Sequence, residues 1–110
     1  MRLVPPGLAL SSEVWAEVQA ILQRCAAEWE VWAFGSRTTG KAKPYSDLDL
    51  ALITEVPLTL SQMATLQEAF DASDLTFRVD LVDWAATSES FRQIIAAHKV
   101  IVKSAQSAPP

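Results

Sequence analysis

The stretch "GSRTTGKAKPYSDLDLALI", residues 35–53, places two aspartates, Asp47 and Asp49, at the head of an apolar run. Leucine occupies every second position from 48 to 52, and this period of two predicts a β-strand whose aspartates point to the opposite face from its leucines. Ala51 and Ile53 share the face of the aspartates and are apolar. We therefore expect the carboxylates at one end of a face that is covered further along.

The segments around this strand predict an α/β fold. Helical spacing of apolar residues predicts three helices, which begin after Ser11 or Ser12, at Ser61, and after Thr87 or Ser88. Alternating β-prone runs predict two further strands, residues 30–34 and 75–82, and the apolar run "VIVK" follows the last helix. The first two strands should pair antiparallel, whereas a crossover helix lets the second and third pair in parallel. The result is a small mixed β-sheet flanked by helices.

Length and composition limit the classes of function. The 110 residues predict a single domain, 1–110, with a core over about 11–103 and a disordered tail over 104–110. The net charge is −4, and the basic residues show no cluster beyond Arg37, Lys41 and Lys43, so direct nucleic-acid binding is not expected. The single cysteine and the lack of an apolar run of about 20 residues or a recognisable signal peptide favour a cytoplasmic protein without a membrane segment.

A third carboxylate, Asp80, is expected beside the first pair. In the strand 75–82 it has the opposite parity to the inward-facing Phe77, Val79 and Leu81, so it can point to the same side as Asp47 and Asp49. Two carboxylates about 4 Å apart repel by about 1 kcal/mol in water and about 4 kcal/mol at an effective dielectric constant of 20. Such a cluster needs a proton or a cation, and oxygen ligands suit Mg²⁺.

Asp83 does not belong to this cluster. It lies three residues after Asp80, has the wrong parity and stands where the strand should end, so a turn or cap role is expected.

A phosphate-binding turn precedes the aspartates. Gly35 follows a strand directly and allows close backbone approach, and Ser36 offers a hydroxyl and an N–H at the start of a helical turn. Ten residues separate Ser36 from Asp47, enough for the chain to return alongside the first strand. Arg37, Lys41 and Lys43 are placed to neutralise phosphate charge, although solvated loop lysines are the more common case.

Together these motifs resemble a known family. "GS", ten residues, "DLD" and a later strand with "VDLV" are similar to the minimal nucleotidyltransferases of the DNA polymerase beta superfamily, over roughly residues 15–103. The resemblance implies a nucleotidyltransferase fold and transfer of a nucleoside monophosphate with release of pyrophosphate. It implies that Ser36 binds the triphosphate, that Asp47 and Asp49 bind two Mg²⁺ ions, and that Asp80 completes the cluster and helps to activate the attacking hydroxyl.

The same resemblance implies a partner. Small proteins of this type resemble the antitoxin half of two-component modules whose other half is a HEPN-family ribonuclease toxin, which implies transfer of AMP from ATP to a tyrosine of that toxin. Two alternatives stay open: a non-catalytic antitoxin that neutralises its partner by contact, and a small-molecule nucleotidyltransferase, which normally needs an additional domain. The oligomeric state, self-association included, is also left open.

Overall fold

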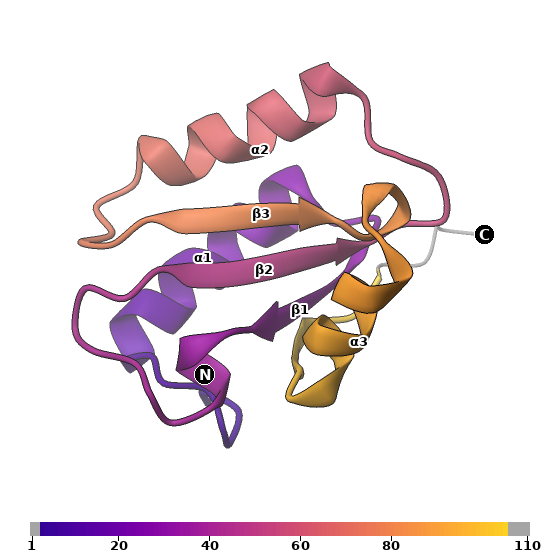
Figure 1. The fold of residues 1–110 in the computed structure, drawn as a ribbon. Helices are drawn as coiled ribbons and strands as arrows, with labels where there is room; N and C mark the ends of the chain where they lie inside the picture. The colour runs from indigo at the N-terminus through magenta and orange to yellow at the C-terminus, as the bar shows by residue number, and fades with distance from the viewer. Residues whose placement is uncertain (1–2, 106–110) are drawn as a thin grey trace.

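The computed structural model describes residues 3–105, which form one sheet with helices on both of its faces (Figure 1). The elements are, in chain order, α1 (Ser12–Cys25), β1 (Glu30–Phe34), the 3₁₀ turn η1 (Ser36–Thr38), β2 (Leu48–Ile53), α2 (Leu60–Asp71), β3 (Val79–Asp83), the 3₁₀ turn η2 (Trp84–Ala86), α3 (Glu89–Ala97) and β4 (Val100–Lys103). The predicted α/β fold with a small mixed sheet is confirmed.

The strand order is β3-β2-β1-β4. β1 and β2 pair antiparallel and β2 and β3 pair parallel, as predicted. The run "VIVK" forms the additional edge strand β4, which pairs antiparallel with β1 and has a register shift at Val31 and Trp32. The parallel pair follows from the α2 crossover, which returns the chain to the same end of the sheet.

The two faces of the sheet bury different apolar clusters. The larger cluster contains the β2 leucines, as the alternation predicts, and α1 and α2 pack on it through residues such as Leu22 and Leu66. The smaller cluster on the opposite face centres on Phe34, Ala51 and Ile95 of α3. Ala51 therefore covers the far part of the face that Asp49 shares, as expected from the sequence.

Side-chain caps fix where the helices begin. The hydroxyl of Ser11 accepts a hydrogen bond from the backbone N–H of Val14, and that of Ser88 accepts one from Phe91. Helix α2 begins one residue before the predicted Ser61, because Thr59 caps it and forms a reciprocal capping box with Gln62.

Two sequence expectations need a change. β3 begins at Val79 and not at residue 75, because residues 75–78 make no ladder with β2. Of the predicted tail, Ser104 and Ala105 have no regular secondary structure, and residues 106–110 lie outside the described residues. Within residues 3–105, none of the helices is long and apolar enough to cross a bilayer.

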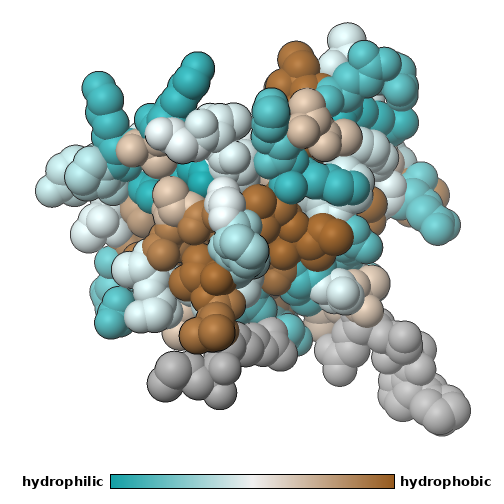
Figure 2. All heavy atoms as spheres, turned by 90° about the horizontal axis from the view of Figure 1, so that it is seen from below, coloured by the Kyte–Doolittle hydropathy of each residue, from teal (hydrophilic) through white to brown (hydrophobic). Residues whose placement is uncertain are grey.

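The surface is uneven in polarity. Seen from below the view of Figure 1, apolar side chains gather in the middle of the molecule (Figure 2). Figure 1 draws β1 and α3 on this lower side and β3 in the upper half. The apolar surface therefore lies away from the strand that carries Asp80.

Candidate functional site

Two of the three predicted carboxylates occupy paired positions on neighbouring strands. Asp49 of β2 is the register partner of Asp80 of β3, and on its other side it pairs with Phe34 of β1. Side chains at paired positions of parallel strands point to the same face. Asp47 lies one residue before β2 begins and is exposed. The predicted common face of Asp49 and Asp80 is confirmed.

The electrostatics of Asp49 reflect this crowding. Burial raises its pKa above the usual value, and the negative charges of Asp80 and Asp47 raise it further. Each cause disfavours the ionised carboxylate, so the site favours either a proton or a cation there.

Asp80 has a second partner. Its Oδ1 lies 2.9 Å from Nε of Arg78, whose side chain is 74% exposed. Among the described residues, no three His, Cys, Asp or Glu side chains are gathered closely enough to hold a metal ion. The predicted convergence is therefore a shared face and not a closed set of ligands. An ion pair this exposed contributes about 1 kcal/mol or less, so breaking it would cost little if a divalent cation bound Asp80. Carboxylate oxygens are also the ligands that Mg²⁺ prefers, so the donor set fits that ion.

The Gly35-Ser36 turn lies directly against Asp49. Gly35 directly follows β1 and has φ 82° and ψ −154°, a conformation that residues with a side chain rarely adopt. A Cβ added there would overlap Oδ2 of Asp49 and lie 3.2 Å from its Cγ. Glycine thus permits both the sharp turn and the close approach of the carboxylate. Ser36 begins η1 immediately afterwards, at the same edge of the sheet.

Arg37, predicted from its position to neutralise phosphate charge, has a buried guanidinium in the structure. The residue is only 6% exposed. Its Nε and Nη2 donate to the carbonyl of Ser46 at 3.1 and 2.7 Å, Nη2 also donates to Pro44 at 3.2 Å, and Nη1 donates to Ala9 at 2.9 Å. Burial lowers its pKa, opposed by the nearby charge of Asp47. These carbonyls occupy every nitrogen of the side chain, which is a structural role.

The two loop lysines differ from Arg37. Lys41 and Lys43 both lie exposed in the connection between η1 and β2. The backbone N–H of Lys43 donates to Oγ of Ser46 at 2.8 Å. Phosphate neutralisation by Lys43 stays a prediction.

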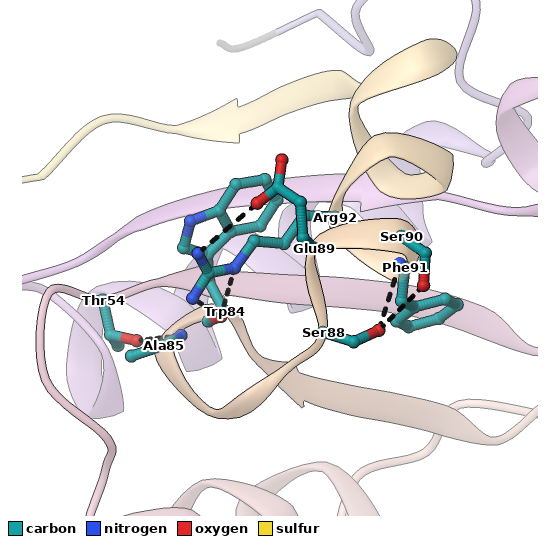
Figure 3. A network of polar contacts seen from close by, with 8 residues as sticks. All are labelled: Thr54, Trp84, Ala85, Ser88, Glu89, Ser90, Phe91 and Arg92. Atoms are coloured by element: carbon teal, nitrogen blue, oxygen red, sulfur yellow. Dashed lines mark hydrogen bonds and ion pairs between the residues drawn. The ribbon is translucent and has the colours of Figure 1, made fainter.

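Asp83 has the turn role expected for it, although it does not cap the following 3₁₀ turn with its side chain. Its carboxylate accepts from the hydroxyl of Thr54 at 2.6 Å and from the backbone N–H of Leu58 at 2.7 Å. The Oγ of Thr54 in turn accepts from the N–H of Ala85 at 3.0 Å (Figure 3). Thr54 was missed by the sequence analysis, and the available signal was a polar residue directly after a buried strand.

A polar network joins α3 to η2 (Figure 3). Nε and Nη2 of Arg92 donate to the carbonyl of Trp84 at 3.0 and 2.8 Å, and the guanidinium lies 5.3 Å from the centroid of the Trp84 ring. This network lies just beyond the C-terminal end of β3, whereas Asp80 is the second residue of that strand. The two carboxylate groups of β3 therefore serve opposite ends of the strand.

Comparisons with known proteins agree with this geometry. The family model described as polymerase beta, nucleotidyltransferase matches residues 17–107. The probable protein adenylyltransferase MntA of Haemophilus influenzae is 54% identical over 96 residues, which cover 87% of this chain and 84% of that protein.

Solved structures show the same fold. One chain of a toxin–antitoxin complex with AMP-PNP has a TM-score of 0.69 at 24% identity, covering 84% of this chain and 74% of that one. A chain from a structure of tri-AMPylated Shewanella oneidensis HEPN toxin in complex with MNT antitoxin has a TM-score of 0.61 at 23% identity, covering 82% and 69%. Fold, site and sequence identity lead to one assignment: the chain belongs to the polymerase beta nucleotidyltransferases and, within them, to the minimal enzymes of the MntA type.

Proposed function

We propose that this nucleotidyltransferase moves AMP from ATP to a tyrosine hydroxyl of a HEPN-family toxin and thereby acts as its antitoxin. The observation that carries the proposal is the pairing of Asp49 with Asp80 directly beside the Gly35-Ser36 turn. This pairing brings acidic oxygens and the backbone of the Gly35-Ser36 turn to one edge of the sheet. The 54% identity to a probable protein adenylyltransferase supports the choice of a protein acceptor.

The nucleotide would lie across the turn and the carboxylates. Ser36 begins a helical turn, where a backbone N–H and a hydroxyl favour phosphate oxygens, and the exposed Lys43 adds positive charge at the mouth of the site. A toxin–antitoxin complex of the same fold contains AMP-PNP, an ATP analogue, which supports ATP as the donor.

The residues suited to hold Mg²⁺ are Asp47, Asp49 and Asp80. Two bound ions would neutralise phosphate charge and align the attacking and leaving oxygens. Burial, and then the charges of Asp80 and Asp47, raise the pKa of Asp49, and a bound cation would offset the repulsion between these charges. Asp80 would exchange its exposed ion pair with Arg78 for this role and would stand ready to accept the proton of the acceptor hydroxyl. The new bond joins the tyrosine oxygen to the α-phosphorus, and pyrophosphate leaves.

The acceptor would be presented by a separate folded protein. The site residues account for the nucleotide alone, and in-line transfer needs an oriented acceptor. A net charge of −4 is poorly suited to gripping nucleic acid, so we assign the acceptor to protein. A neighbour of the same fold is an MNT antitoxin in complex with a tri-AMPylated HEPN toxin, which supports this class of partner.

The test is a mass measurement on a HEPN-family toxin incubated with this protein. The wild-type protein, with ATP and Mg²⁺, should increase the mass of the toxin by one or more AMP units and abolish its ribonuclease activity. Asp80→Asn should slow transfer at least a hundredfold, about 2.7 kcal/mol of transition-state stabilisation. Asp83→Asn is the matched control, because Asp83 lies on the same strand but serves the opposite end of it.

One observation favours the non-catalytic alternative. Asp80 is paired with Arg78, and the described carboxylates form no closed ligand set. If the partner is bound and inhibited with no added mass, neutralisation by contact replaces adenylylation. If Asp80→Asn transfers AMP as well as Asp83→Asn, the role proposed for Asp80 is wrong.

A further inference from the structure

Arg37 stands apart from the other basic residues of the site. It follows Ser36 directly, yet its side chain turns inward and is 6% exposed. Its guanidinium lies 4.1 Å from the centroid of the Phe77 ring. Within residues 3–105 it forms no ion pair with a carboxylate. Placing a charge in such a position is costly unless its donors are satisfied, and here backbone carbonyls satisfy them.

The carbonyls that Arg37 binds belong to the segment that delivers Asp47. The carbonyl oxygen of Ser46 accepts two of these hydrogen bonds, at 3.1 and 2.7 Å. The carbon of this carbonyl forms the peptide bond to Asp47. The Pro44 carbonyl, at 3.2 Å, lies two residues earlier. These two hydrogen-bonded carbonyls, within the three residues before Asp47, fix the position of the backbone that carries this exposed carboxylate. No regular element does so, because β2 starts only at Leu48.

The same side chain fixes the surroundings of this segment. Arg37 donates to the carbonyl of Ala9 at 2.9 Å, and its own carbonyl accepts from the N–H of Ala9 at 2.9 Å, so the N-terminal segment is held on both sides. Phe77, under the guanidinium, precedes Arg78, whose carbonyl accepts from the N–H of Leu48 at 2.9 Å. Arg37 therefore lies where β2 and β3 enter the sheet together.

We propose that Arg37 is a positioning residue that holds residues 44–47 so that Asp47 stands beside Asp49, and that the affinity of the carboxylates for a divalent cation depends on it. The inference rests on the proposed metal-dependent function, but it concerns metal binding and not transfer. Partners that orient metal ligands typically change metal affinity 10–100-fold when they are lost. A phosphate contact, the role expected from the sequence, would instead act on ATP.

The test compares Arg37→Lys with Arg92→Lys, measuring Mn²⁺ binding by calorimetry and electron paramagnetic resonance without nucleotide. Arg92 is the matched control, since it also donates from Nε and Nη2 to one carbonyl and lies over an aromatic ring, but at the far end of β3. Arg37→Lys should weaken Mn²⁺ binding at least about tenfold, because an ammonium cannot reproduce the planar fork. Arg92→Lys should bind Mn²⁺ like the wild type.

Two further measurements keep the inference testable. Arg37→Lys should need more Mg²⁺ for half-maximal transfer, and excess Mg²⁺ should restore most of its rate. Should Arg37→Lys fail to fold, Phe77→Leu removes only the ring beneath the guanidinium and should weaken Mn²⁺ binding in the same direction by a smaller factor.

The outcomes separate cleanly. Unchanged Mn²⁺ binding in Arg37→Lys with a raised KM for ATP at saturating Mg²⁺ would overturn the inference in favour of a phosphate contact. Equal losses of Mn²⁺ affinity in Arg37→Lys and Arg92→Lys would overturn the inference, because they would show an effect of general stability and not of positioning. No Mn²⁺ binding by the wild type would overturn the inference and the proposed metal dependence together. Arginine-dependent Mn²⁺ binding without any AMP transfer would overturn the proposed function alone.

Discussion

Replacing Gly35 with alanine should inactivate the enzyme by displacing a carboxylate that the substitution does not itself remove. The new Cβ would overlap Oδ2 of Asp49, which must then rotate away or push the turn outward. Gly40 provides the matched control, because it also has a positive φ, 76°, while an added Cβ there would meet no atom within 4 Å. The two substitutions share the backbone strain and differ in the collision.

The magnitudes separate strain from function. An alanine forced into a region used almost only by glycine costs about 1–3 kcal/mol of unfolding free energy, so both variants should be destabilised. Only Gly35→Ala moves a proposed metal ligand, and losing such a group costs at least about 2.7 kcal/mol of transition-state stabilisation, or about a hundredfold in rate. Gly40→Ala should transfer AMP at close to the wild-type rate per folded molecule.

Urea unfolding and AMP transfer to the partner measure these two effects. Asp49→Ala removes the colliding atoms, leaving only the contact of the new Cβ with the Asp49 Cβ at 3.5 Å. In that background Gly35→Ala should therefore cost less unfolding free energy than in the wild type. Equal transfer rates for Gly35→Ala and Gly40→Ala, or additive losses of stability in the double variant, would refute the close approach of Gly35 and Asp49.

Three further outcomes follow from single contacts. Since burial, then Asp80 and Asp47, raise the pKa of Asp49 in the folded protein, the free energy of unfolding should fall as the pH rises from the unfolded aspartate pKa of about 3.9 through the raised folded value. Asp49→Asn should remove this dependence and exceed the wild type in stability above that range, as urea titrations across a pH series would reveal. Asp83→Asn should lower the free energy of unfolding by about 1–3 kcal/mol, because either the Thr54 hydroxyl or the Leu58 N–H loses its charged acceptor. Thermal unfolding of this variant beside Asp80→Asn checks the loss. Lys103→Met should lower the free energy of unfolding by about 3 kcal/mol, because it leaves buried carbonyls without a donor, while AMP transfer per folded molecule stays unchanged. A urea unfolding midpoint equal to that of the wild type would contradict this prediction.

The paired carboxylates could be predicted because strand alternation is a local property. Leucines at every second position of β2 fix which face Asp49 occupies, and the same parity rule places Asp80 on β3. A helix of crossover length between the strands then makes them parallel. Register, face and pairing follow from these facts without any tertiary information.

The remaining features depend on contacts between distant segments. The short run "VIVK", three apolar residues followed by a lysine, does not distinguish a strand from the end of a helix, so its pattern alone does not predict β4. Arg37 looks like a phosphate contact when only its neighbours in the loop are considered. Its burial depends on the carbonyl of Ala9, 28 positions away, which no local pattern indicates.

The side chain of Lys103 connects the last described strand with the turn that follows the first helix. Its ammonium donates to the carbonyls of Ala26, Ala27 and Trp29, between 74 and 77 positions away, at 2.6–3.2 Å. During synthesis, β1 therefore has one unpaired edge, and these carbonyls have no donor, until β4 has left the ribosome. An unpaired edge is a template for association with other chains, and contacts at such separation slow folding. The nascent chain should thus depend on rapid closure by β4, and variants that weaken this closure should aggregate during expression more than their final stability explains.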